Sequence, residues 1–187
     1  MSRRGFLGLF GLAGTAIALN PLTGLAVTAA TPSPSLPADW MKTLGAKAGD
    51  YVAFLEKLKL RFLPTAKIIE PHLKQHGSVR NSLPPSELWN NMPSTLLVAD
   101  KIAECLGENI VEIISAYRSP AYNATCPGGK THSQHLRNGA LDLVFRSSPA
   151  KVAKVARELR SQGVFKGGVG LYPDFTHVDT RGNNADW

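Results

Sequence analysis

The chain has 187 residues, of which 21 are lysine or arginine and 14 are aspartate or glutamate, so its formal net charge at neutral pH is +7. A basic chain can bind nucleic acid, but this sequence has no aromatic and basic pattern typical of a nucleic-acid-binding module. We therefore exclude nucleic acid as a partner and expect most basic side chains to form a solvated surface.

Residues 1–30 have the features of an export signal. Arg3 and Arg4 precede a stretch without charged residues, 5–30, which is interrupted by glycines and a proline and ends in small residues. These features favour a signal peptide that is removed over the alternative, a permanent membrane anchor. The motif "SRRGFLG" resembles the twin-arginine consensus, with Gly8 in place of lysine. The resemblance implies the twin-arginine export machinery as a partner, transient membrane contact through the signal, and a periplasmic or other extracytoplasmic location.

Removal of the signal leaves 187 − 30 = 157 residues, enough for one domain with a core of its own. The signal holds two basic and no acidic residues, so the mature net charge is 19 − 14 = +5, which favours attraction to anionic cell-wall polymer. Residues 31–38, rich in proline and serine, are predicted to be a linker. Residues 39–83 are predicted to be an N-terminal helical segment, followed by a second unit over 84–187.

The pattern along the chain predicts helices first and then a small sheet. Apolar residues recur at helical spacing between residues 39 and 63, and later segments are assigned from β-branched content and turn residues. We expect helices over 92–107, capped by Ser94 and stopped by Gly107, and over 148–163, capped by Ser148, and strands over 109–117, 139–145 and in a hairpin at 167–180. The predicted class is α+β, a small antiparallel sheet with flanking helices.

The stretch "HSQHLRNGALDLVF" places two histidines, His132 and His135, before an apolar strand that contains Asp142. A carboxylate in such a strand is unfavourable unless it is paired or bound to a cation. The turn "RNG" between them can bring an imidazole back over the carboxylate. By position, either histidine is a candidate metal ligand.

A later stretch, "THVDT", places His177 and Asp179 on one face of its strand. If this strand neighbours the one that carries Asp142, two histidines and a carboxylate converge. Three such ligands leave one tetrahedral position open, as in catalytic zinc sites. Spacing alone leaves a second interpretation open, in which the histidines are hydrogen-bonded core residues without a metal.

Four motifs in order carry a family resemblance: "AYRSPAYN", "GGKTHSQHLRNGALDL", "GGVGLYP" and "HVDTRG". They resemble the zinc D-alanyl-D-alanine carboxypeptidases and their murein endopeptidase relatives, which share a fold with the hedgehog signalling domain. The likeness covers about residues 84–187 and implies a zinc peptidase domain there. The implied zinc ligands are His135, Asp142 and His177, which leaves His132 outside. Asn138 stands where the family has glycine, and we expect the turn to survive because asparagine tolerates the left-handed conformation.

The resemblance also implies roles for other residues. Asp179 and Asp174 compete as the general base that takes a proton from the attacking water. We favour Asp179 as the base; its alternative role is to hold the metal ligand His177 in place. Arg118 resembles the arginine that binds the substrate's carboxylate or carbonyl oxygen. Ser133 and Asn123 are predicted to orient the substrate-binding loop.

The implied activity is hydrolysis, with Zn²⁺ as cofactor, of peptide bonds involving D-amino acids in peptidoglycan stem peptides or cross-links. The alternative from another class is a non-catalytic module on the same fold that binds peptidoglycan peptide without turnover. The intact set of metal-binding residues favours the enzyme, since a binder does not need an open coordination position.

Two further pairs of residues need an interpretation. Cys105 and Cys126 could form a disulfide in an oxidising compartment, but spacing does not decide this. His72 and His76 lie four residues apart on a predicted helix. No third ligand is near them in the sequence, and we interpret both as solvated.

Overall fold

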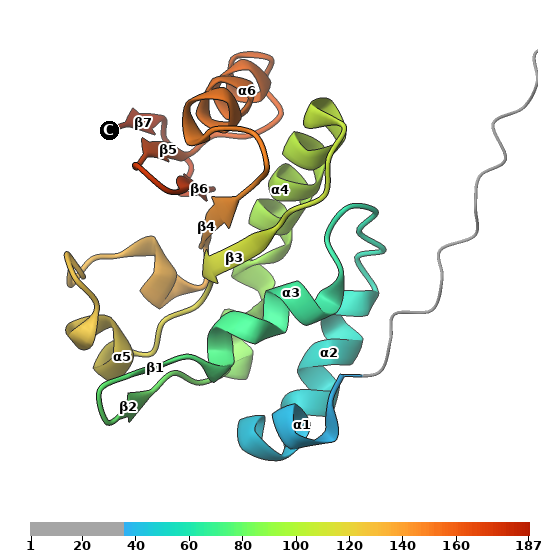
Figure 1. Cartoon of the computed structure of the whole chain (residues 1–187), viewed down its shortest axis with the longest axis vertical. Coiled ribbons are helices and arrows are strands. Elements are labelled where there is room, and N and C mark those ends of the chain that lie inside the picture. Colours follow the sequence, from blue (N-terminus) through green and yellow to red (C-terminus); the bar gives the residue numbers. More distant parts are fainter. Residues whose placement is uncertain (1–35) are drawn as a thin grey trace, which may run out of the picture. The chain divides into compact units, whose positions relative to one another are not determined.

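The structure is a computed structural model that describes residues 36–187 (Figure 1). The predicted signal peptide at 1–30 and most of the predicted linker at 31–38 lie outside the described residues. Within the described part of the chain, no helix is both long enough and apolar enough to cross a membrane.

Short helices come first, as predicted. Their bounds are Ala38–Leu44 (α1), Ala48–Glu56 (α2), Thr65–Ile69 (α3) and Glu70–Leu73 (η1, a 3₁₀ helix). Tyr51 and Leu55 of α2 are fully buried and belong to the same hydrophobic cluster as Leu141 of the sheet. The N-terminal helices and the sheet therefore share one hydrophobic core.

A small hairpin follows that the sequence did not indicate. Its strands, β1 (Gln75–His76) and β2 (Val79–Arg80), pair antiparallel. Each strand has only two residues, too few to give a recognisable alternation of apolar and polar side chains.

The main sheet has five strands in the order β3-β4-β6-β5-β7. Their bounds are Glu112–Ser115 (β3), Ala140–Val144 (β4), Gly168–Leu171 (β5), Thr176–Asp179 (β6) and Ala185–Asp186 (β7). The pairs β3–β4, β4–β6 and β5–β6 are antiparallel, as predicted, and β5 and β6 form the predicted hairpin. The prediction of a wholly antiparallel sheet is wrong at one edge, because β7 pairs with β5 in parallel.

Two longer helices, α4 (Pro93–Leu106) and α6 (Pro149–Ser161), contact each other and the sheet. The Ser148 hydroxyl accepts a hydrogen bond from the Lys151 amide, so the predicted cap of α6 is confirmed. The predicted cap of α4 is wrong: Met92 holds the N-cap position without a side-chain bond, because the helix already begins at Pro93, a residue suited to the first helical position. Gly107 ends α4 in the left-handed conformation, as predicted.

Shorter helices complete the fold. They are η2 (Ser86–Asn91), α5 (Pro120–Thr125) and η3 (Gln134–Arg137). The mixture of helices and a small sheet confirms the α+β class. Figure 1 shows α5 beside the β1–β2 hairpin, away from α6, and η3 contacts β4.

The alternation of side chains divides the sheet into a core face and a site face. Leu141 of β4 pairs with Val178 of β6, which pairs with Val169 of β5, and all three are fully buried in the core. The next position along β4 turns to the other face. There Asp142 pairs with His177, so the core packing fixes the register that brings these two side chains together.

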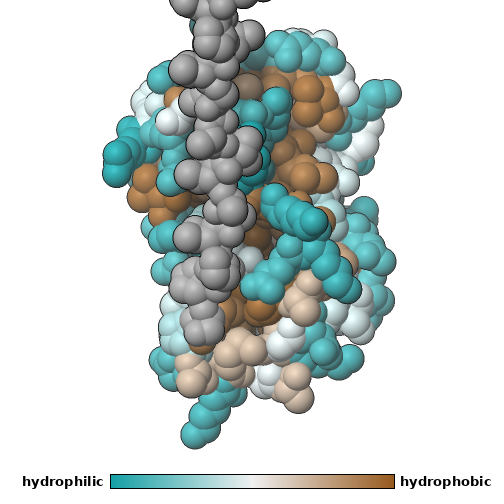
Figure 2. Space-filling model, turned by 90° about the vertical axis from the view of Figure 1, so that its right-hand side faces the viewer, coloured by the Kyte–Doolittle hydropathy of each residue, from teal (hydrophilic) through white to brown (hydrophobic). Residues whose placement is uncertain are grey.

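Figure 2 shows polar side chains interspersed with apolar ones on one face of the molecule. Large apolar residues that are more than a third exposed are Leu97, Val111, Val164, Leu171, Tyr172 and Trp187. Single exposed apolar residues are usual on protein surfaces. Tyr172 and Trp187 differ from the other four, because they line the cavity described below.

Candidate metal centre

His135, Asp142 and His177 converge as the sequence predicted. One ligand atom from each residue lies within 4.8 Å of the others, and all three side chains are buried. Asp142 and His177 come from the neighbouring strands β4 and β6, and His135 comes from η3, the 3₁₀ helix before β4. His132, the alternative ligand, is exposed at the rim and does not belong to the cluster.

The turn between His135 and Asp142 has the predicted geometry. Ser133 caps η3, and its hydroxyl accepts a hydrogen bond from the His135 amide at 3.3 Å. Asn138 ends η3 in the left-handed conformation, with φ 55° and ψ 38°, and its side-chain amide donates to the Leu88 carbonyl at 3.1 Å. The asparagine therefore replaces the family's glycine without loss of the turn.

The outer partners of the two histidines bear on which ring nitrogen is available to a metal. His135 Nδ1 lies 2.6 Å from the Ala116 carbonyl oxygen, which can only accept, so Nδ1 carries the hydrogen. His177 has a carboxylate on each side: Nε2 lies 3.0 Å from Oδ2 of Asp179, and the tautomer that can bind a metal through Nδ1 is the one in which Nε2 donates to Asp179. With these tautomers, the other nitrogen of each neutral ring, Nε2 of His135 and Nδ1 of His177, carries a lone pair.

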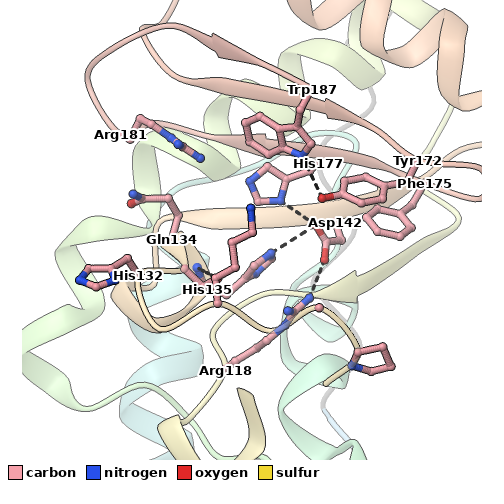
Figure 3. A pocket seen from close by; sticks show the side chains of 14 residues that line it. Arg118, His132, Gln134, His135, Asp142, Tyr172, Phe175, His177, Arg181 and Trp187 are labelled. Atoms are coloured by element: carbon pink, nitrogen blue, oxygen red, sulfur yellow. Dashed lines mark hydrogen bonds and ion pairs between the residues drawn. The ribbon is translucent and has the colours of Figure 1, made fainter. Parts of the chain in front are cut away.

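These two lone pairs point at the same carboxylate oxygen. His135 Nε2 is 3.2 Å and His177 Nδ1 is 2.8 Å from Asp142 Oδ1 (Figure 3). Three acceptors that face one another in a buried site repel unless a cation, either a proton or a metal ion, lies among them. The cluster is therefore a site for a cation, and its three residues could hold a metal ion.

Protonation would relieve the repulsion only in part. Burial lowers the pKa of His135 and outweighs the opposing effect of Asp142, so the ring is held neutral. Burial also lowers the pKa of His177, but the bonds to Asp142 and Asp179 outweigh it and raise the pKa overall. Burial raises the pKa of Asp142, yet the two histidines hold it below its usual value. The carboxylate is thus ionised and available as a ligand.

The donor set fits Zn²⁺. Two nitrogens and one oxygen are common zinc ligands, and two atoms bound tetrahedrally at about 2.0–2.1 Å lie about 3.3 Å apart. The separation of 3.2 Å between His135 Nε2 and Asp142 Oδ1 is close to that value, and the separation of 2.8 Å between His177 Nδ1 and Asp142 Oδ1 is shorter. His135 would bind through Nε2, His177 through Nδ1 and Asp142 through Oδ1.

Arg118 binds the second carboxylate oxygen of Asp142, Oδ2. Its Nη2 donates to Asp142 Oδ2 at 2.8 Å, and its Nε donates to the Ser115 hydroxyl at 2.7 Å. Ser115 lies opposite Asp142 because β3 has an irregularity between Ile113 and Ser115, a feature that often redirects side chains near sites. Arg118 therefore orients the carboxylate so that Oδ1 faces the histidines. Nη1 of Arg118 makes none of the hydrogen bonds found among residues 36–187.

Asp179 lies behind His177. The carboxylate is fully buried, and besides His177 it accepts hydrogen bonds from the Gly168 amide at 3.0 Å and from the Arg181 amide and Nε at 3.1 and 2.8 Å. Burial raises its pKa, but the bonds from His177 and Arg181 outweigh this and hold the pKa well below the usual range. A carboxylate held in this way fixes the orientation and tautomer of a metal-binding histidine.

A cavity of about 310 Å³ opens onto the three residues. Its lining includes Arg118 and Ser133, two of the residues predicted to bind substrate. Asn123 is not part of the lining; it is buried, and its side-chain amide donates to the Lys130 carbonyl at 3.1 Å, which holds the loop at the rim. Asp174 is exposed in the turn between β5 and β6 and is not part of the lining either.

The three residues form a candidate metal centre that is open to the cavity on one side. A family model described as Peptidase M15 matches residues 68–179, more than half of the chain, and the chain belongs to this family, whose peptidases are zinc-dependent. The match begins before the boundary predicted at residue 84. Neither the curated proteins nor the solved structures gave a match to the chain.

Several lining residues were not singled out from the sequence. They are Lys130, Gln134, Tyr172, Phe175, Arg181 and Trp187. One available signal was "GGVG", since glycines alternating in a strand often mark the close approach of another group. In this chain the group is the indole of Trp187, which lies against Gly168 and Gly170.

The structure also shows the surroundings of the two cysteines and of His72 and His76. Both cysteines are free: Cys105 is exposed, and the Cys126 thiol donates to the Tyr122 carbonyl at 3.4 Å. His76 is exposed, as expected. The interpretation of His72 as solvated is wrong, because it is fully buried, and burial lowers its pKa to about 4.

Proposed function

We propose that the mature protein is a zinc metallopeptidase that hydrolyses peptide bonds involving D-amino acids in peptidoglycan stem peptides or their cross-links. The observation that carries the proposal is the convergence of His135 Nε2 and His177 Nδ1 on Asp142 Oδ1 in a buried site beside an open cavity. Membership of the Peptidase M15 family supports the same chemistry.

The chain's own residues divide the work. His135, Asp142 and His177 would hold Zn²⁺, which when bound makes a water molecule acidic enough to attack a carbonyl near neutral pH and polarises that carbonyl. Arg118 keeps Asp142 in position through Nη2 and has Nη1 available for an oxygen of the substrate. A guanidinium suits a carboxylate or a carbonyl oxygen equally well.

The position of the two other aspartates favours different roles for them. Asp179 is buried and holds His177, so we assign it the supporting role rather than the role of the base. Asp174 is exposed, and Tyr172, two residues before it, and Phe175, directly after it, line the cavity. We therefore assign Asp174 as the general base that takes the proton of the attacking water and passes it to the leaving amine.

Export is part of the proposal and rests on the sequence motif alone. Twin-arginine export carries folded proteins, and this suits an enzyme that takes up its metal before it crosses the membrane. In this proposal the substrate is met outside the cytoplasm, and the mature net charge of +5 (19 − 14) favours contact with anionic wall polymer.

The alternative function is a binding module that holds stem peptides without turnover. Digestion of purified sacculi by the mature zinc-loaded protein, with products identified by mass spectrometry, separates the two. Released D-alanine would identify a carboxypeptidase, and cleaved cross-links would identify an endopeptidase. Undigested sacculi that nevertheless retain the protein would favour the binding module.

A further inference from the structure

Residues 180–187 lie beyond the end of the family match and supply part of the cavity wall. The short strand β7 is held in place by two arginines of α6: Arg157 Nε and Arg160 Nη2 lie 2.7 and 2.5 Å from the carboxylate oxygens of Asp186. Arg160 also donates to the Ala185 carbonyl at 2.9 Å. These bonds fix the backbone that carries Trp187.

The indole of Trp187 lies on a surface made by two glycines of β5. A Cβ atom at Gly170 would lie 2.5 Å from Trp187 Nε1, and one at Gly168 would lie 2.9 Å from the ring. Both positions therefore require glycine for the indole to lie where it does. Nε1 donates to the Tyr172 hydroxyl at 2.8 Å, and the guanidinium of Arg181 lies 5.1 Å from the ring centroid. The orientation of the ring is thus fixed on several sides.

The fixed indole is next to the metal centre and open to the cavity. Its ring centroid is 5.2 Å from that of His177, yet Trp187 remains 44% exposed. Tyr172 stacks on Phe175 with ring centroids 4.4 Å apart, and both line the same cavity. Figure 3 shows these three aromatic residues on one side of the ligands and Arg118 on the other.

The charges of the lining are distributed unevenly. Arg118, Lys130 and Arg181 line the cavity, and Asp142 has the single acidic side chain among the described lining residues. Lys130 forms no ion pair within residues 36–187, in contrast to the two arginines. The cavity thus combines an aromatic wall with a basic side, and it suits a peptide that has an aliphatic segment and a carboxylate close together.

We propose that Trp187 is a specificity-determining residue, the wall against which the aliphatic segment of the substrate packs beside His177, with Tyr172 holding the indole in place. An exposed, rigid aromatic surface is well suited to this, because substrate burial there removes apolar area from water without ordering a flexible side chain. The kinetic part of the test rests on the peptidase activity proposed above, whereas the binding part does not.

The test compares Trp187→Leu with a matched control, Leu171→Ala. Leu171 is 43% exposed on the same strand as the two glycines but does not line the cavity. The zinc-loaded mature protein is given a stem pentapeptide ending in D-Ala-D-Ala for measurement of kcat and KM. A reduced-bond analogue of the same peptide, which cannot be hydrolysed, gives the Kd by calorimetry.

For Trp187→Leu we expect KM and the Kd of the analogue to rise at least about tenfold, as for other buried aromatic contacts, while kcat stays within about threefold and zinc remains at one per chain. Leu171→Ala should stay within about twofold on every measure. Trp187→Phe and Tyr172→Phe, which keep most of the packing, should raise KM by a smaller factor. These two variants replace Trp187→Leu in the test if the leucine variant does not fold.

Unchanged KM and Kd in Trp187→Leu would overturn the proposal. So would a loss of zinc and of kcat with the Kd unchanged, because Trp187 would then act only as a support for His177. If the wild-type protein binds the analogue but hydrolyses no peptide, and Trp187→Leu weakens that binding, the peptidase proposal fails and this one stands.

Discussion

Asp179→Asn tests whether the buried carboxylate behind His177 controls the metal centre. In the native protein Asp179 Oδ1 accepts from the Gly168 and Arg181 amides, and Oδ2 accepts from His177 Nε2 at 3.0 Å. The single oxygen of an asparagine would stay with the two backbone amides, which places its NH₂ group against His177 Nε2. Two donors then face each other. His177 must move its hydrogen to Nδ1, the nitrogen that faces Asp142 Oδ1 at 2.8 Å.

This change removes the lone pair with which His177 would bind the metal. We expect zinc affinity to fall about ten- to a hundredfold, the usual effect of losing such a partner, or about 1–3 kcal/mol of binding free energy. Titration against a competing chelator gives the affinity, and activity measured over a range of zinc concentrations should recover in part at the highest. A variant that keeps wild-type zinc affinity but has no activity would refute this reasoning and return Asp179 to the role of the base.

Three other predictions follow from the remaining assignments. Asp174→Asn should keep one zinc per chain, since the residue is not a ligand, while the hydrolysis rate falls by roughly two to four orders of magnitude; near wild-type rates would exclude Asp174 as the base. His72 has its pKa lowered from 6.5 to about 4 by burial, so the unfolded chain binds this proton at higher pH than the folded one, and stability should fall by about 3 kcal/mol as pH drops from 6.5 to 4. Urea denaturation at pH 7 and pH 4.5 should show a smaller loss in His72→Phe than in the wild type, and equal losses would contradict the buried assignment. Replacement of Arg3 and Arg4 by lysine should trap the precursor in the cytoplasm, because the arginine pair is read by a receptor; an unchanged exported yield, measured by cell fractionation, would indicate another export route.

The sequence predicted that Asp142 and His177 lie on the same face of the sheet because the rules that place them there are local. Alternation on β4 turns Asp142 away from the core residues Leu141 and Leu143, and the same rule on β6 places His177 on the opposite face from Val178. The turn at Asn138 is also local, since it depends on a residue that accepts the left-handed conformation. The pairing of the two strands had to be assumed, and the choice of His135 over His132 came from the family resemblance.

The sequence did not predict features that depend on distant contacts. Trp187 reaches the cavity because β7 pairs with β5 and is held by arginines of α6, and no local pattern encodes that pairing. His72 is buried because Tyr51 of α2 packs edge-on against its ring, and this contact lies between separate helices. The bonds of Asp179 to Arg181 and to the Gly168 amide, on which its proposed supporting role rests, also join segments that no local pattern brings together. The hedgehog-like fold stays a prediction from the family.

Zinc content is the most direct test of the central claim, that His135, Asp142 and His177 hold a catalytic metal. Elemental analysis of the purified mature protein should give one zinc per chain. His135→Ala and Asp142→Ala should each lose it, because each removes one of three ligands, whereas His132→Ala, at the exposed rim of the same loop, should keep it. Full zinc in both His135→Ala and Asp142→Ala would contradict the account.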